Sequence, residues 1–259
     1  MADNSAISQF AAAFAEGNIR IVDLSVTLNE ETPVLQLPEQ FGQGWPFRKE
    51  EISHYDERGP AWYHNNFSCC EHTGTHFDAP IHWVTGKDYD HHATDTIKPE
   101  HFIAPACVID CSGYVAEDED FLIRPSHIEA WEQQYGRIPA KNWVLFHSGW
   151  SGRTPEDFLN MREDGAHTPG PSRETVELLA KERDVLGFGT ETVGTDAGQG
   201  PMFDPPFPCH SIMHGSNKFG LASLTNLDKL PATGALIVAA PLKIEQGSGS
   251  PCRVVALVG

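Results

Sequence analysis

The apolar residues of this 259-residue chain fall into short runs that alternate between strand-like and helix-like patterns. Runs rich in β-branched, aromatic and other apolar residues predict strands over 19–28, 60–70, 105–111, 143–147, 185–189, 236–240 and 254–258. Segments that follow a capping residue or end at a glycine predict helices over 5–16, from the Ser126–Glu129 capping box to Gly136, and over 174–182. Strands and helices interleave with no break in composition and no internal repeat, which predicts a single α/β domain over residues 1–259.

Two irregular segments interrupt this alternation. Residues 29–48 combine several prolines and glycines with apolar side chains, so we expect this loop to lie over a pocket or a partner subunit. Residues 194–208 are rich in glycine and proline and predict a second loop. His210 and His214 follow this second loop at helical spacing.

Composition narrows the class of protein. Apolar residues make up 40% and charged residues 21% of the chain, which is typical of a globular protein. The formal net charge of -18 argues against nucleic acid or an anionic membrane as a partner. We find no signal peptide and no apolar run long enough to span a bilayer. Six cysteines without a Cys-x2-Cys pair are expected to be reduced, as in a cytoplasmic protein.

The chemistry concentrates in residues 71–82, where three histidines and an aspartate fall close together. First-row transition metals bind imidazole and carboxylate groups, and a catalytic metal site keeps coordination positions open. His72, His76 and Asp78 are therefore the predicted metal ligands. Gly74 and Pro80 argue against one regular helix, so we expect an extended segment to direct His76 and Asp78 to one side and the Gly74 turn to bring in His72.

His82 follows closely enough to act as a general base. A bound metal lowers the pKa of a water to about 7, and a histidine can take the released proton and return it to the leaving group. Flat apolar walls for an aromatic substrate are expected from aromatic residues in several segments, with ordinary core packing as the alternative. These residues are Phe41, Trp62, Tyr63, Trp83 and Phe207.

Two rival functions remain open at this point. Two histidines and one carboxylate also form the metal-binding face of iron(II) oxygenases, which would consume oxygen. A metal-binding protein without catalytic activity is the other rival. The ligand types do not choose among zinc, manganese and iron.

The segment from His72 to His82 reads His-x-Gly-Thr-His-x-Asp-x-Pro-x-His and resembles the signature of the cyclase-type metal hydrolases. This family includes bacterial kynurenine formamidases and isatin hydrolases. Ile21–Ser25 and Leu224–Asp228 are also similar to the family, so the resemblance spans most of the chain. It implies a swivelling β/β/α fold and a homodimer in which the partner chain completes an aromatic pocket.

The downstream residues resemble the isatin hydrolase branch. The formamidases hold a second metal with a histidine matching His210 and a glutamate at the position of Ala222. The alanine implies a one-metal site, with Mn2+ as the expected ion and Zn2+ as the alternative. Ser223 matches a serine that this branch uses for proton movement, and His210 and Ser223 are expected to act beside His82. The resemblance thus implies hydrolysis of the cyclic amide of isatin to isatinate, with N-formylkynurenine hydrolysis as the alternative.

Overall fold

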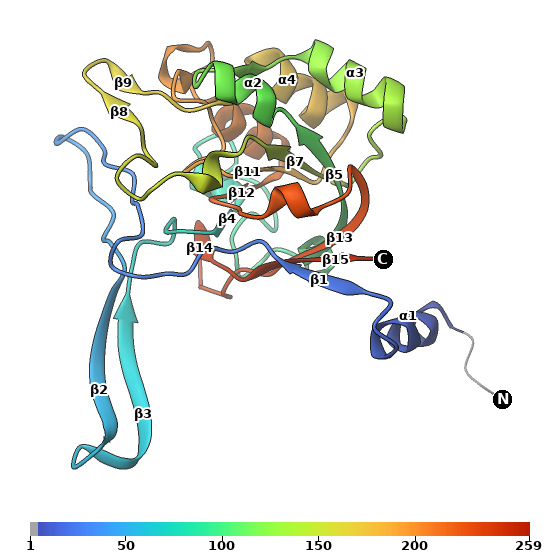
Figure 1. Cartoon of the computed structure of the whole chain (residues 1–259). Coiled ribbons are helices and arrows are strands. Elements are labelled where there is room, and N and C mark those ends of the chain that lie inside the picture. The colour runs from blue at the N-terminus through green and yellow to red at the C-terminus, as the bar shows by residue number, and fades with distance from the viewer. Residues whose placement is uncertain (1–4) are drawn as a thin grey trace.

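A computed structural model describes residues 5–259 and places one large mixed sheet at the centre of this part of the chain (Figure 1). Its nine strands run in the order β1-β15-β13-β5-β7-β11-β12-β4-β14. They are β1 (Arg20–Asp23), β4 (His76–Asp78), β5 (Ile103–Asp110), β7 (Trp143–His147), β11 (Gly187–Thr190), β12 (Phe219–Ala222), β13 (Thr233–Ala239), β14 (Gly249–Pro251) and β15 (Val254–Val258). Neighbours from β5 to β12 are parallel and the remaining neighbours are antiparallel.

Helices and smaller strand pairs surround this sheet. The helices are α1 (Ala6–Ala15), α2 (Ser112–Glu117), α3 (Pro125–Tyr135) and α4 (Arg173–Glu177), and α4 continues into a π-helical turn over Leu178–Glu182. The other strands are β2 (Arg48–Asp56), β3 (Gly59–Ser68), β6 (Leu122–Ile123), β8 (Met161–Arg162), β9 (Gly165–Ala166) and β10 (Gly170–Pro171). In Figure 1, α2, α3 and α4 lie together over one face of the sheet, while α1 stands apart. No helix within residues 5–259 combines the length and apolar character needed to span a bilayer.

Strand β7 shows why the sequence forms this architecture. Val144 and Phe146 join the apolar cluster beneath the helices, whereas Trp143 and Leu145 join the cluster on the opposite face. Successive side chains of a strand point to opposite faces, so a strand covered on both sides requires a continuous apolar run. The strands predicted around β5, β7, β11, β13 and β15 are confirmed for this reason.

The strand predicted over 19–28 is too long, because regular pairing ends at Asp23. Beyond that residue the Ser25 hydroxyl takes over a ladder position: it accepts a hydrogen bond from the Val254 amide at 2.7 Å and lies 3.1 Å from the Val254 carbonyl oxygen. The predicted N-terminal helix is confirmed as α1, with Ser5 as its cap.

The predicted capping box of the central helix is wrong. Helix α3 begins at Pro125, and its actual cap is Arg124, whose amide donates to the His127 imidazole at 2.9 Å. Proline is well suited to the first helical position because its missing N–H has no partner there. The helix nevertheless ends at Gly136, as predicted.

Strands β2 and β3 form a hairpin that projects away from the sheet (Figure 1). The predicted strand over 60–70 is confirmed as β3, but the charged segment of β2 gave no strand pattern. Tyr55, Trp62, Tyr63 and Phe67 on this hairpin are 41–65% exposed. A two-stranded hairpin that buries so little apolar surface is only marginally stable by itself.

Candidate active site

Strand β4 places His76 and Asp78 on the same side of the chain, because side chains two residues apart in a strand point the same way. Both are almost completely buried, and the His76 Nε2 lies 3.3 Å from the Asp78 Oδ1. The residues that pair with Asp78 on the two neighbouring strands are Gly220 and Gly249, which have no side chains. A Cβ at Gly220 would stand 2.6 Å from the Asp78 Oδ2, so the glycine leaves this carboxylate its space.

The turn before β4 brings His72 back onto the same carboxylate. Gly74 has φ of +60°, and a Cβ there would lie 2.5 Å from a methyl carbon of Leu28, so both conformation and space favour glycine. The His72 Nδ1 lies 2.8 Å from the Asp78 Oδ1. The structure therefore brings His72 and His76, two of the predicted metal ligands, each within 3.3 Å of the third, Asp78. His76 does not belong to either group of residues whose possible ligand atoms all lie within 4.8 Å of one another.

The hydrogen bonds around these side chains fit a bound cation. The His76 Nδ1–H donates to the Gly74 carbonyl at 2.7 Å, so the Nε2, which faces Asp78, is the ring nitrogen that can bind a cation. Burial by itself would raise the pKa of Asp78, but the nearby His76 and His72 hold it well below its usual value. An ionised carboxylate with imidazole nitrogens turned toward it is the donor set that Mn2+ or Zn2+ accepts.

His82 lies directly beside this group. It ends a short 3-10 turn over Pro80–His82, and its ring centroid is 3.8 Å from that of His72. His72, Asp78 and His82 each place a possible ligand atom within 4.8 Å of the others. Burial, reinforced by His72, lowers the pKa of His82 to about 2, so the imidazole is neutral near pH 7.

A second pair of histidines approaches from the loop after residue 208. His210 and His214, with Asp78, also place possible ligand atoms within 4.8 Å of one another. The His214 Nδ1–H donates to the Lys218 carbonyl, and its buried Nε2 has no hydrogen-bond partner within residues 5–259. Burial lowers the pKa of His214 to about 4, so this Nε2 is a free acceptor turned toward the site.

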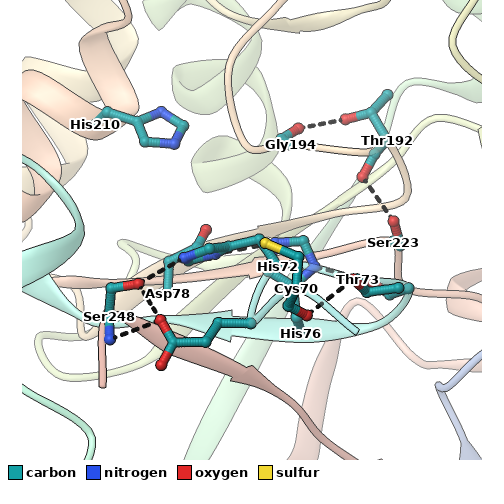
Figure 2. Close-up of polar contacts among 12 residues, drawn as sticks. Cys70, His72, Thr73, His76, Asp78, Thr192, Gly194, His210, Ser223 and Ser248 are labelled. Carbon is teal, nitrogen blue, oxygen red and sulfur yellow. Dashed lines mark hydrogen bonds and ion pairs between the residues drawn. The ribbon is translucent and has the colours of Figure 1, made fainter. Parts of the chain in front are cut away.

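Asp196 controls the orientation of His210. Its carboxylate accepts from the Cys209 amide at 2.7 Å and lies 2.5 Å from the His210 Nδ1. Burial opposes protonation of His210, but the hydrogen bond to Asp196 and the negative charges of Asp196 and Asp78 together outweigh burial and raise the pKa of His210. Figure 2 shows His210 above Asp78 and His72, on an element separate from β4.

Ala222 is the direct cross-strand partner of His76. Its methyl group is fully buried and offers no ligand atom to a metal. Ser223 follows with φ of +51°, and its hydroxyl donates weakly, at 3.5 Å, to the Thr192 carbonyl (Figure 2). The Ser223 carbonyl accepts a hydrogen bond from the Thr75 hydroxyl at 2.6 Å, which connects the end of β12 to the turn before β4.

The five predicted pocket aromatics separate into two groups. Trp83 and Phe207 lie near the site, with the Trp83 ring 5.0 Å from the His210 ring and 5.6 Å from the Phe207 ring. The structure does not bring Trp62 and Tyr63 to the site of their own chain, because they lie on the projecting hairpin. Phe41 is 57% exposed in the loop before that hairpin.

Several residues around the site were not predicted from the sequence. Asp196, Ser248 and the glycines of β12 and β14 come from distant segments, and Ser248 is 176 positions from its partner His72. The helical spacing of His210 and His214 was the one available signal for the second pair. That spacing is realised in a π-helical turn over Cys209–Met213 that leads into the next turn at His214.

The cluster is a candidate metal site in a sheet-based fold, and comparison with known proteins identifies a hydrolase family. The chain belongs to the cyclase family, whose model matches residues 22–197. Isatin hydrolase from Roseibium aggregatum is 47% identical over 100% of this chain and 99% of its own length. Kynurenine formamidase from Salinibacter ruber is 28% identical over 91% of this chain and 96% of its own length.

Solved structures agree with this assignment. Isatin hydrolase A from Ralstonia solanacearum is 59% identical, with a TM-score of 0.98 over 100% of this chain and 99% of that protein. A second isatin hydrolase, bound to the product analogue thioisatinate, is 47% identical, with a TM-score of 0.96 and the same coverage. The expected α/β fold of the cyclase family is thereby confirmed.

Proposed function

We propose that this protein is a metal-dependent amidohydrolase that opens the cyclic amide of isatin to give isatinate. The observation that carries the proposal is the convergence of His72, His76 and Asp78 beside the neutral His82. The full-length similarity to isatin hydrolases supports the cyclic amide as the substrate. A structure of one such relative with thioisatinate supports a small aromatic carboxylate as the product.

His72, His76 and Asp78 are the proposed ligands of one ion, Mn2+ with Zn2+ as the alternative. When bound, such an ion polarises the substrate carbonyl and makes water a stronger nucleophile near neutral pH. Asp78 contributes the negative charge, and Gly74 fixes the tautomer of His76 through its carbonyl. Ala222 supports a single ion, because it cannot supply the carboxylate of a second site.

Proton transfer is assigned to His82 and His210. The neutral His82 accepts a proton from the attacking water and returns it to the ring nitrogen as the carbon–nitrogen bond breaks. Its low pKa means that His82 holds the proton only briefly. His210, whose pKa Asp196 raises, is the better resting place for a proton, and its ring lies 5.2 Å from that of His82. Ser223 is proposed to assist proton movement at the edge of the site.

Trp83 and Phe207 are proposed to line the substrate pocket of their own chain. Their rings flank His210, so an aromatic substrate held against them would lie next to the proposed proton-transfer groups. Phe41, Trp62 and Tyr63 remain proposed substrate contacts through a partner chain.

A comparison of two substrates tests the proposal. The Mn2+-loaded protein is expected to hydrolyse isatin with a kcat/KM at least about 100-fold higher than for N-formylkynurenine. A substrate whose carbonyl is misplaced in the site loses several kcal/mol of transition-state stabilisation. Isatin loss and kynurenine formation can be followed in parallel by absorbance. Efficient cleavage of N-formylkynurenine with no isatin turnover would establish the formamidase alternative instead.

The protein is proposed to form a homodimer through the projecting hairpin. Exposed apolar patches mark interaction sites, and a second copy would bury the aromatic side chains of β2 and β3 that the chain leaves exposed. The double variant Trp62→Ser with Tyr63→Ser is expected to shift the protein from dimer to monomer in light scattering and to weaken isatin binding. Tyr135→Ser, an equally exposed aromatic on α3, is the matched control. A monomeric wild-type protein, or a double variant that stays dimeric, would contradict the proposal.

A cytoplasmic location and a single domain over residues 1–259 are also proposed. All six cysteines are free, and burial raises the pKa of Cys107, Cys111, Cys209 and Cys252, which suits reduced thiols. The two apolar clusters share strands of one sheet, which supports one folding unit.

A further inference from the structure

The second ring nitrogen of His72 enters a hydrogen-bond chain that leaves the metal-ligand cluster. The His72 Nε2 lies 2.9 Å from the Ser248 hydroxyl, and this hydroxyl lies 2.5 Å from the Glu71 Oε2 (Figure 2). The Ser248 amide also donates to the same carboxylate oxygen, at 3.2 Å. All three side chains are partly buried.

The donors and acceptors in this series of hydrogen bonds follow from the chemistry of Glu71. An ionised carboxylate only accepts hydrogen bonds, so the Ser248 hydroxyl donates its single proton to Glu71. The Ser248 oxygen must then accept from His72, which places the proton of a neutral His72 on the Nε2. The Nδ1 lies 2.8 Å from the Asp78 Oδ1, and a bound cation can take the place of a proton between these two atoms.

The backbone holds this arrangement in register. Ser248 directly precedes β14, whose Gly249 pairs with Asp78, and the Ser248 carbonyl accepts from the Ala79 amide at 2.9 Å. A Cβ at Gly249 would lie 2.6 Å from the His72 Cε1. The glycine therefore lets the imidazole approach closely enough for its Nε2 to reach Ser248.

We infer that Ser248 and Glu71 are positioning residues that hold His72 as the Nε2–H tautomer, with the Nδ1 aimed at the proposed metal site. The inference rests on the proposed function, since it assigns a role toward the same ion. Neutral imidazole has two tautomers, and only one of them presents the Nδ1 lone pair to a cation. Partners that orient a metal-binding histidine typically change metal affinity by 10- to 100-fold when they are removed.

Three substitutions test this assignment. Ser248→Ala removes the acceptor for the Nε2–H and is expected to weaken Mn2+ binding by roughly 10- to 100-fold, measured by competition with a chelator. Ser248→Thr keeps the hydroxyl and is expected to restore most of the affinity. Glu71→Gln keeps an acceptor oxygen without the charge and is expected to show a smaller loss. Glu245→Gln, an exposed residue in the same loop as Ser248, is the control.

Nitrogen NMR of the Zn2+-loaded protein gives a readout that a loss of packing would not produce. The wild-type His72 is expected to show a protonated Nε2 and an Nδ1 that binds the metal in place of a proton, and in Ser248→Ala the Nε2 proton is expected to exchange faster with water. Wild-type affinity and an unchanged exchange rate of the Nε2 proton in Ser248→Ala would overturn the assignment. Failure of the wild-type protein to bind Mn2+ would instead overturn the proposed metal site.

Discussion

Asp78→Asn is expected to abolish stoichiometric metal binding and to lower kcat/KM for isatin by at least about 1000-fold, since a metal site contributes several kcal/mol to transition-state stabilisation. Asparagine has nearly the same shape as aspartate but carries no charge. Asp78 is the carboxylate on which His72 and His76 converge, so its neutralisation leaves imidazoles as the remaining ligands of the site. Metal content after dialysis and isatin kinetics measure the two effects.

A second signal should accompany this loss. Burial opposes protonation of His76, and the charge of Asp78 is the largest cause that raises its pKa above the ordinary value. The Asn variant is therefore expected to lower the pKa of His76 in the metal-free protein, which NMR titration can detect. Asp90→Asn, an exposed aspartate downstream of the motif, is the control and should change neither quantity. Full metal occupancy in Asp78→Asn would remove Asp78 from the ligand set.

His82→Ala is expected to lower kcat by roughly 100- to 10,000-fold while the protein still binds one metal ion, which is the range that a general base contributes. Burial keeps His82 neutral near pH 7, so it can accept a proton without first losing one. The measurement is kcat together with metal content on the same sample.

The control separates this effect from the loss of any histidine. His91→Asn is suitable because His91 is exposed and has φ of +58°, a conformation that asparagine tolerates better than alanine. It should leave kcat within about 2-fold, as for a surface substitution. If His82→Ala loses the metal along with turnover, His82 belongs to the ligand set rather than to the proton-transfer groups.

The sequence predicts the metal-ligand group because its spacing is local. His72, Gly74, His76 and Asp78 lie within seven residues, so one turn and one short strand determine their geometry. The central strands are equally accessible to prediction, since burial on both faces requires continuous apolar runs such as the one in β7. These features depend on neighbours in the chain or on the side-chain period of a strand.

The remaining features depend on long-range pairing. Strands β12 and β14 are three or four residues long and contain glycine or proline, so they carry no strand signal of their own. Strand β12 pairs with β4 and β11, and β14 pairs with β4. The pairing with β4 places Gly220, Ala222 and Ser248 around the proposed ligands. Asp196 likewise reaches His210 through the fold of an irregular loop. The sequence also gives no sign that Trp62 and Tyr63 lie on a projecting hairpin, away from the site of their own chain.

The most direct test of the central claim is to follow the oxygen atom that enters the product. Protein stripped with a chelator and reloaded with Mn2+ is incubated with isatin in water labelled with heavy oxygen, while an electrode records dissolved oxygen. We predict isatinate that carries one labelled oxygen in its new carboxylate, no oxygen consumption, and no product before Mn2+ is restored. Product that takes its oxygen from dissolved oxygen, or ring opening that persists without metal, would contradict a metal-dependent hydrolase.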